Sequence, residues 1–171
     1  MLEAIDSCPA PVVARIQGYC LGGGGGLAAC VDIALSAEDA TFGFSEVKLG
    51  IIPAVISPFV LPKIGQHARR YFLTGERFGA EDALRIGLVS EVAEDAGERA
   101  EAVVRDLLAG GPVAVREAKK LVREQPTGID TAHIAAARRT SDEGQDGLRA
   151  FLDKRAPEWQ ASNRSDSRRD L

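Results

Sequence analysis

The sequence predicts a mixed α/β fold, and three observations carry that prediction. A β-branched run over residues 12–16, bounded by proline and glycine, is typical of a buried strand. Five consecutive glycines, 22–26, then lead into small apolar residues that suit a helix packed closely on a sheet. Later in the chain, apolar residues recur with helical spacing. We therefore expect an α/β core over 1–95 and a helical segment over 96–160.

Short apolar or β-branched runs bounded by turn residues predict the strands of the core. From residue 51 the chain stays apolar but prolines interrupt it, so short helices or loops with a kinked path are expected. A helix within 68–78 is expected to end before Gly75, and another over 80–87 has acidic residues in its first turn. The strand candidates lie at 12–16, 32–37, 41–44 and 88–92.

The second half of the chain is expected to be helical. Pro112 stands at the start of one helical segment, where a helix tolerates proline. The final stretch, 161–171, is a polar tail that we expect to fray. The predicted helices cover 97–109, 112–123, 129–140 and 142–155.

Composition narrows the classes of function. The 171 residues suffice for one domain with a sizeable core, and 45% apolar with 27% charged residues is usual for a soluble globular protein. A net charge of −4 argues against binding to nucleic acid or to an anionic membrane through charge. No apolar run reaches the roughly 18 residues of a membrane span, and no signal peptide is expected.

Few residues are available for disulfide, metal or histidine chemistry. The three cysteines are an odd number without a CxxC spacing, and the chain has only two histidines. We expect free thiols in a reducing cytoplasm, no metal site and no Ser-His-Asp triad.

The glycine run is the most informative feature, because five glycines in regular structure cost several kcal/mol, at roughly 0.5–1 kcal/mol each. A tight strand-to-helix turn uses them for positive φ and for close backbone approach. Such a turn aims N–H groups of a helix start at one point, where a phosphate or an oxyanion can bind. The spacing does not fit a Rossmann or Walker loop cleanly. The alternative interpretation is a flexible loop.

Several stretches resemble the crotonase (enoyl-CoA hydratase/isomerase) superfamily. The first is residues 18–55, with the glycine run and the segment FGFSE, and the others are 64–92, 111–122 and 146–159. The resemblance implies a ClpP/crotonase-like spiral of ββα turns and a C-terminal helical segment that builds homotrimers or homohexamers. It also implies that the sequence lacks an N-terminal part of the family fold, with its first strands and one of two oxyanion donors.

The resemblance further implies an acyl-CoA thioester substrate, with no cofactor beyond the CoA of that substrate. By motif position, Gly23 supplies a backbone N–H to the thioester oxygen, and Glu46 is the catalytic acid/base. A carboxylate between a strand-like run and an apolar segment can exchange protons near neutral pH; the alternative is a surface glutamate. The expected substrate-binding residues are Gly22, Gly24, Gly26, Pro53, Ser57, Phe151 and Lys154.

One departure from the family pattern bears on the reaction. Many hydratases carry a second catalytic glutamate at the position of Gly26, which has no side chain. Either Glu46 acts alone or with another group, or the reaction needs one base, as in double-bond isomerisation. Residues 50–65 resemble proteins of the methylglutaconyl-CoA hydratase type, where Ser57 could bind water or a substrate carboxylate; the alternative for Ser57 is a helix N-cap.

The resemblance therefore implies an enoyl-CoA hydratase, with methylglutaconyl-CoA as the favoured substrate and a place in fatty-acid or branched-chain amino-acid breakdown. The alternatives are an enoyl-CoA isomerase that uses Glu46 alone and a non-catalytic acyl-CoA-binding or oligomeric remnant.

Overall fold

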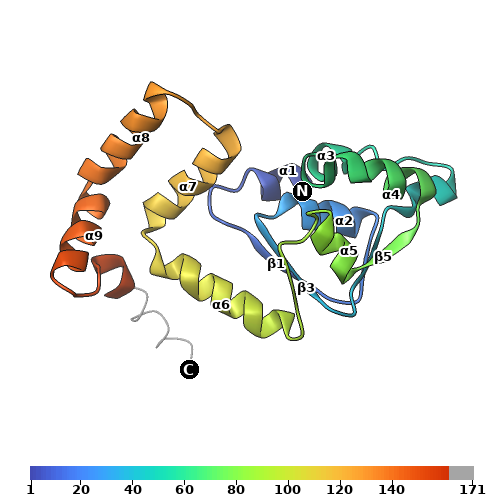
Figure 1. Ribbon diagram of the computed structural model, residues 1–171, viewed down its shortest axis with the longest axis horizontal. Helices are drawn as coiled ribbons and strands as arrows, with labels where there is room; N and C mark the ends of the chain where they lie inside the picture. Colours follow the sequence, from blue (N-terminus) through green and yellow to red (C-terminus); the bar gives the residue numbers. More distant parts are fainter. Residues whose placement is uncertain (162–171) are drawn as a thin grey trace. The chain divides into compact units, whose positions relative to one another are not determined.

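The computed structural model describes residues 1–161 and divides into two compact units (Figure 1). The first unit is Met1–Val103 and the second begins at Val104, so the boundary falls inside helix α6 (Ala96–Ala109). The division expected at residue 95 would lie before this helix. Of the predicted polar tail, only residue 161 is among the described residues.

The first unit contains two small sheets, and the chain passes from one to the other several times. One is all parallel in the order β1-β3-β6, formed by β1 (Val13–Ile16), β3 (Ile33–Ala37) and β6 (Glu91–Ala93). Its register pairs Val13 with Ile33 and Leu35 with Glu91. Because β1 and β3 are parallel neighbours, the intervening chain must cross over, and it does so through helix α2 (Gly23–Cys30).

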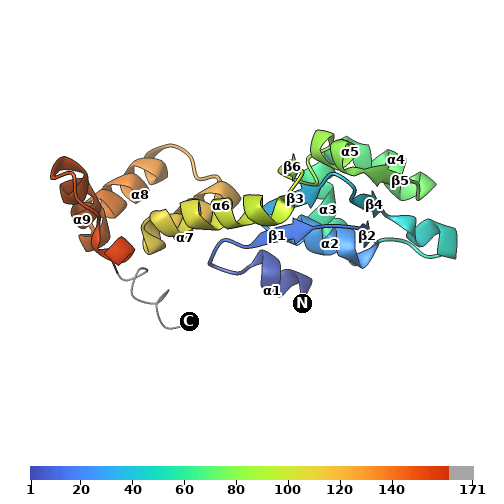
Figure 2. The same ribbon diagram turned by 90° about the horizontal axis from the view of Figure 1, so that it is seen from below.

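The second sheet has the order β2-β4-β5, with β2 parallel and β5 antiparallel to β4. Each of its strands follows a strand of the first sheet or a helix after a tight turn, so successive strand pairs and helices wind as a spiral (Figure 2). The sequence did not predict β2 or β5, each of which is three residues long. The strands are β2 (Tyr19–Leu21), β4 (Thr41–Gly43) and β5 (Arg77–Gly79).

A cluster of aromatic rings forms the core of the first unit. Phe42 and Phe44 are fully buried, and Tyr71 is 4.1 Å from Phe78 between ring centroids. Phe44 lies edge-on against Phe72 at 5.0 Å. Side chains this closely packed have little room to move, which fixes the start of the segment that follows Phe44.

The helices largely follow the sequence predictions. The helix expected to stop before Gly75 is α4, which ends at Thr74 with Gly75 in the left-handed region (φ 58°). The kinked path predicted after residue 51 is a loop followed by α3, which contains Pro62. The first-unit helices are α1 (Leu2–Asp6), α2, the 3-10 turn η1 (Ser45–Leu49), α3 (Ser57–Ile64), η2 (Gly65–His67), α4 (Ala68–Thr74) and α5 (Ala80–Arg85).

Several boundaries differ from the sequence predictions; the helix expected over 142–155, for example, ends at Leu152. The strand expected from residue 88 begins only at Glu91, because the backbone N–H groups of Leu88 and Val89 bind the carbonyl of Ala83 at the end of α5. The strand expected over 41–44 ends at Gly43, and Phe44 already leads into η1.

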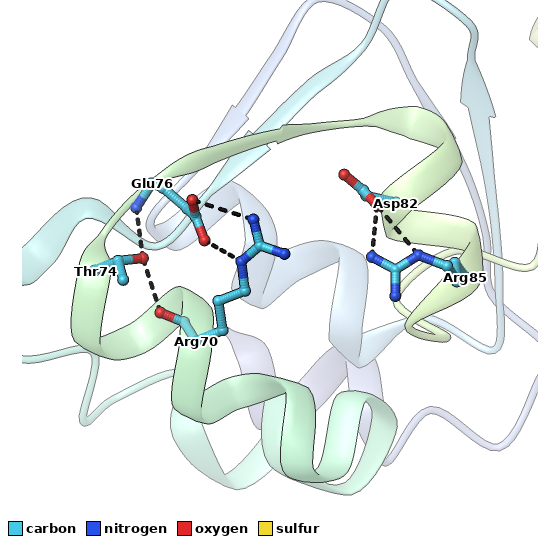
Figure 3. Close-up of polar contacts among 5 residues, drawn as sticks. All are labelled: Arg70, Thr74, Glu76, Asp82 and Arg85. Atoms are coloured by element: carbon cyan, nitrogen blue, oxygen red, sulfur yellow. Dashed lines mark hydrogen bonds and ion pairs between the residues drawn. The ribbon is translucent and has the colours of Figure 1, made fainter.

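Polar contacts around α4 and α5 hold the turn into β5 (Figure 3). The Arg70 guanidinium binds the Glu76 carboxylate at 2.5 Å, and the Thr74 hydroxyl donates to the Arg70 carbonyl while accepting the Glu76 N–H. Asp82 accepts from Arg85 within α5. These exposed contacts lie on the outer side of the unit and join α4 to β5.

The second unit consists of helices. After the end of α6 come α7 (Pro112–Glu124), α8 (Ile129–Thr140) and α9 (Asp142–Leu152). Pro112 is the first residue of α7, as predicted, and the Glu143 carboxylate accepts the N–H groups of Val113 and Ala114. The Trp159 indole N–H donates to the Ala109 carbonyl at 3.1 Å. Within residues 1–161, no helix is long and apolar enough to cross a membrane.

Candidate active site

The glycine run forms the turn between β2 and α2 and the first half of that helix. Gly22 is the N-cap residue with φ 51° and ψ −113°, a conformation that L side chains rarely adopt. Its N–H binds the Gly43 carbonyl at 2.8 Å, which ties the turn to β4. The first backbone hydrogen bond of the helix is donated by the Gly26 N–H to the Gly22 carbonyl. The N–H of Gly23 lies before that first bond, so it has no carbonyl partner within the helix and can donate a hydrogen bond to an oxyanion at the helix start.

The glycines within α2 have different reasons to be glycine. A Cβ on Gly25 would lie 2.7 Å from Cε1 of the buried Phe44, and a Cβ on Gly26 would overlap the Ile56 side chain. A Cβ on Gly24 would be in ordinary contact with the Cys20 Sγ, whereas Gly23 has open space around it. Four of the five glycines are helical, and Gly25 and Gly26 are closely packed, so the interpretation of the run as a flexible loop is wrong.

Glu46 lies beside the start of α2. It is the second residue of η1, just after the buried Phe44, and its Oε1 would be 3.3 Å from a Cβ on Gly22. The other oxygen, Oε2, is buried without a hydrogen-bond partner within the described part of the chain. An unpartnered buried oxygen costs about 1–3 kcal/mol, so an inward-facing Glu46 is not simply a solvated surface side chain. A carboxylate in this position can accept or deliver a proton at the helix start.

Residues of the loop before α3 reach α2 through Ile56, whose side chain lies over Gly26. Pro53 is buried and its carbonyl accepts the Ser57 N–H at 3.1 Å. The Ser57 hydroxyl donates to the Ala54 carbonyl at 2.9 Å, so its proton is already engaged. The N-cap of α3 is Ile56, which leaves Ser57 as the first helical residue, so the alternative of Ser57 as N-cap is wrong.

The structure brings together some of the predicted site residues and adds one. Glu46 lies against Gly22, and the helix start carries Gly23 and Gly24. Ile56, which covers Gly26, was missed, because nothing in the sequence tells which of several apolar residues in this loop turns inward.

Phe151 and Lys154 belong to the second unit. Phe151 is 80% exposed in the last turn of α9, and Lys154 follows in the left-handed region with φ 53°. The Lys154 N–H binds the Phe151 carbonyl at 3.3 Å, so one tight turn carries both side chains. Their part in binding a nucleotide stays a prediction.

The described residues contain no group of three or more His, Cys, Asp or Glu side chains placed to hold a metal ion. Cys8, Cys20 and Cys30 are free thiols, and burial raises the pKa of Cys20 to about 11.

Comparison with known proteins places this geometry in a family. The family model described as enoyl-CoA hydratase/isomerase matches residues 1–162. A carnitinyl-CoA dehydratase of Escherichia coli K12 is 33% identical over 172 aligned residues, which cover 92% of this chain and 66% of that protein. The chain thus spans slightly less than two thirds of this curated relative.

Solved structures agree with this assignment. An enoyl-CoA hydratase from Shewanella pealeana is 40% identical, with a TM-score of 0.85 over 92% of this chain and 63% of that one. An enoyl-CoA hydratase/isomerase from Marinobacter aquaeolei is 34% identical, with a TM-score of 0.82 over 92% of this chain and 64% of that one. The crotonase-like fold predicted from the sequence is confirmed, and the chain belongs to the enoyl-CoA hydratase/isomerase family.

Proposed function

We propose that this chain carries the hydratase chemistry of an enoyl-CoA thioester: addition of water across the α,β-double bond. The observation that supports it most is the Glu46 carboxylate, whose Oε1 lies against Gly22 and whose Oε2 is buried without a partner. It faces the same helix start that presents the Gly23 N–H. A proton carrier and an oxyanion donor at one point are what this reaction requires.

The reaction follows from these two groups. The thioester oxygen accepts a hydrogen bond from the Gly23 N–H, and Glu46 takes a proton from a water molecule as its oxygen bonds to the β-carbon. Negative charge moves to the thioester oxygen, where the N–H and the start of α2 stabilise it. Glu46 then gives the proton to the α-carbon, so that one water is added and the carboxylate is restored. We propose that Gly22 and Gly24, which flank the donor, contact the thioester; a Cβ on Gly22 would meet the Glu46 carboxylate.

The relatives support the class of reaction. Removal of water from a carnitinyl group, which the name of the Escherichia coli relative states, is the reverse of adding water to an enoyl group. For the acyl group we propose methylglutaconyl-CoA, from the likeness of residues 50–65 to that type of hydratase. Ser57 can accept a hydrogen bond from water while its hydroxyl donates to the Ala54 carbonyl.

The remaining features of the family are proposals for this chain as well. We propose a cytoplasmic homotrimer or homohexamer that needs no cofactor beyond the CoA of its substrate. Phe151 and Lys154 are exposed on the second unit, where a stacking ring and a cation suit the nucleotide part of CoA.

Double-bond isomerisation is the second candidate, because Ile56 covers the one position on α2 where a second carboxylate would stand. Glu46 alone can take a proton from one carbon and return it to another. The two reactions differ in mass, since only hydration adds a water to the product.

An absorbance assay with crotonyl-CoA and methylglutaconyl-CoA tests the proposal by following loss of the conjugated thioester band, with mass analysis of the product. We expect turnover by the purified chain and a loss of at least about 10²-fold in Glu46→Gln, the usual contribution of a general acid/base. Glu38→Gln is the matched control, since Glu38 is exposed in the turn between β3 and β4. A folded chain without turnover would favour the non-catalytic alternative.

A further inference from the structure

The pair Gly26 and Ile56 breaks local preferences at both of its positions. Gly26 stands in the interior of α2, where glycine is unfavourable, and Ile56 stands at the N-cap of α3, where a short polar side chain is preferred. Ser57, which has such a side chain, stands one residue later. Where two local rules are broken together, the reason lies in what the residues touch or do.

What they touch is each other. A Cβ on Gly26 would overlap the Ile56 Cγ2 and lie 2.9 Å from the Ile56 Cβ, so no larger residue fits at position 26 while Ile56 stays. Ile56 is 4% exposed, although its neighbour Val55 is 78% exposed. The loop therefore turns this one side chain inward onto α2.

The covered position lies one turn along α2 from the residue that the acid/base contacts. Gly22 is the N-cap of α2, and the Gly26 N–H binds its carbonyl at 3.2 Å. Glu46 lies against Gly22 and Ile56 against Gly26, so the carboxylate and the isoleucine contact positions one helical turn apart. An apolar group beside a proton carrier excludes water from the space that it fills.

We infer that Ile56 determines the specificity of this site: by filling the space over Gly26, it keeps Glu46 as the single proton carrier and limits the access of water to the reacting carbons. The inference rests on the proposed function. Two reactions compete at this site: addition of water to the enoyl group, and transfer of a proton between a substrate carbon and Glu46. Under this inference, Ile56, which is not itself an acid or base, sets the ratio of their rates.

Two rates measured in D₂O give this ratio directly. One is the rate at which water adds to the enoyl group, and the other is the rate at which deuterium exchanges into the C–H positions of that group. Ile56→Ala removes three carbon atoms, enough space for a water molecule that the carboxylate can hold. We expect the ratio of the water-addition rate to the exchange rate to rise about tenfold, because one hydrogen bond from the added water to the Glu46 carboxylate contributes a factor of about this size. Gly26→Glu with Ile56→Gly, which also removes the Cβ that would lie 2.9 Å from the new one and puts a carboxylate into the space, should raise the ratio further.

Ile64→Ala is the matched control, because Ile64 is a buried isoleucine at the other end of α3. If Ile56 were only a core residue, both truncations would lower the melting temperature and neither would change the ratio. A ratio that changes in Ile56→Ala and not in Ile64→Ala supports the inference. A ratio unchanged in Ile56→Ala overturns it.

The contact itself is tested without turnover. Gly26→Ala should lower the melting temperature, and Ile56→Ala should relieve part of that loss, so that the double variant loses about 3 °C less than the sum. The same cycle with Ile64→Ala should be additive. Additive losses with Ile56→Ala would overturn the contact and the inference with it. A wild-type chain that neither hydrates nor exchanges would instead refute the proposed function, and the inference would fall with it.

Discussion

The same substitution, glycine to alanine, should have opposite effects on stability at two positions of the glycine run. At Gly25 the new Cβ would come 2.7 Å from Cε1 of Phe44, and that ring is fully buried. It cannot turn away freely, since Phe72 lies edge-on at 5.0 Å and Phe78 at 6.0 Å between ring centroids. Overpacking of this kind costs about 1–3 kcal/mol, against a gain of roughly 0.5–1 kcal/mol in helix propensity.

At Gly23 nothing lies within 4 Å of the added Cβ, so only the gain in helix propensity remains. We expect Gly25→Ala to lose about 1–2 kcal/mol and Gly23→Ala to gain up to about 1 kcal/mol. The assay is urea denaturation followed by circular dichroism, with the free energy of unfolding extrapolated to water. Equal values for the two variants, within about 0.5 kcal/mol, would refute the packing argument, since propensity alone treats the two positions alike.

Further predictions concern thiols, pH and the second unit. Burial raises the pKa of Cys20 to about 11, so alkylation of the native chain at pH 8 should spare Cys20 and reach the half-buried Cys8 first, as peptide mapping would show. The hydrogen bond from Arg70 lowers the pKa of the Glu76 carboxyl. The small stabilisation that the ionised Glu76 contributes is therefore present above about pH 4.3 and is lost as the pH falls through the lowered pKa. The urea midpoints of Glu76→Gln and of the wild type should therefore converge in acid. Trp159→Phe removes the indole hydrogen bond to α6 and should lower the melting temperature by a few degrees, with no change expected at the thiols.

Features encoded by consecutive residues could be predicted from the sequence. The helix end at Gly75 and the helix start at Pro112 were read from single residues with fixed backbone preferences. The strands at β1 and β3 were read from β-branched and apolar runs. The importance of the glycine run followed from the cost of glycine in regular structure.

Features that depend on contacts between distant residues were decided only by the tertiary structure. β2 and β5 exist because each pairs with β4, and β6 starts late because the end of α5 takes two of the preceding N–H groups. The motif pointed to Glu46, but only the fold turns its carboxylate toward α2.

By itself the sequence determined most of the strands and helices, the family and the candidate for the acid/base, Glu46. The tertiary structure decided what packs against the glycine run: Glu46 against Gly22, Phe44 against Gly25 and Ile56 against Gly26. The reason is physical. Backbone preferences act between chain neighbours, whereas the space around a glycine is filled by side chains that only the packing of other segments brings there.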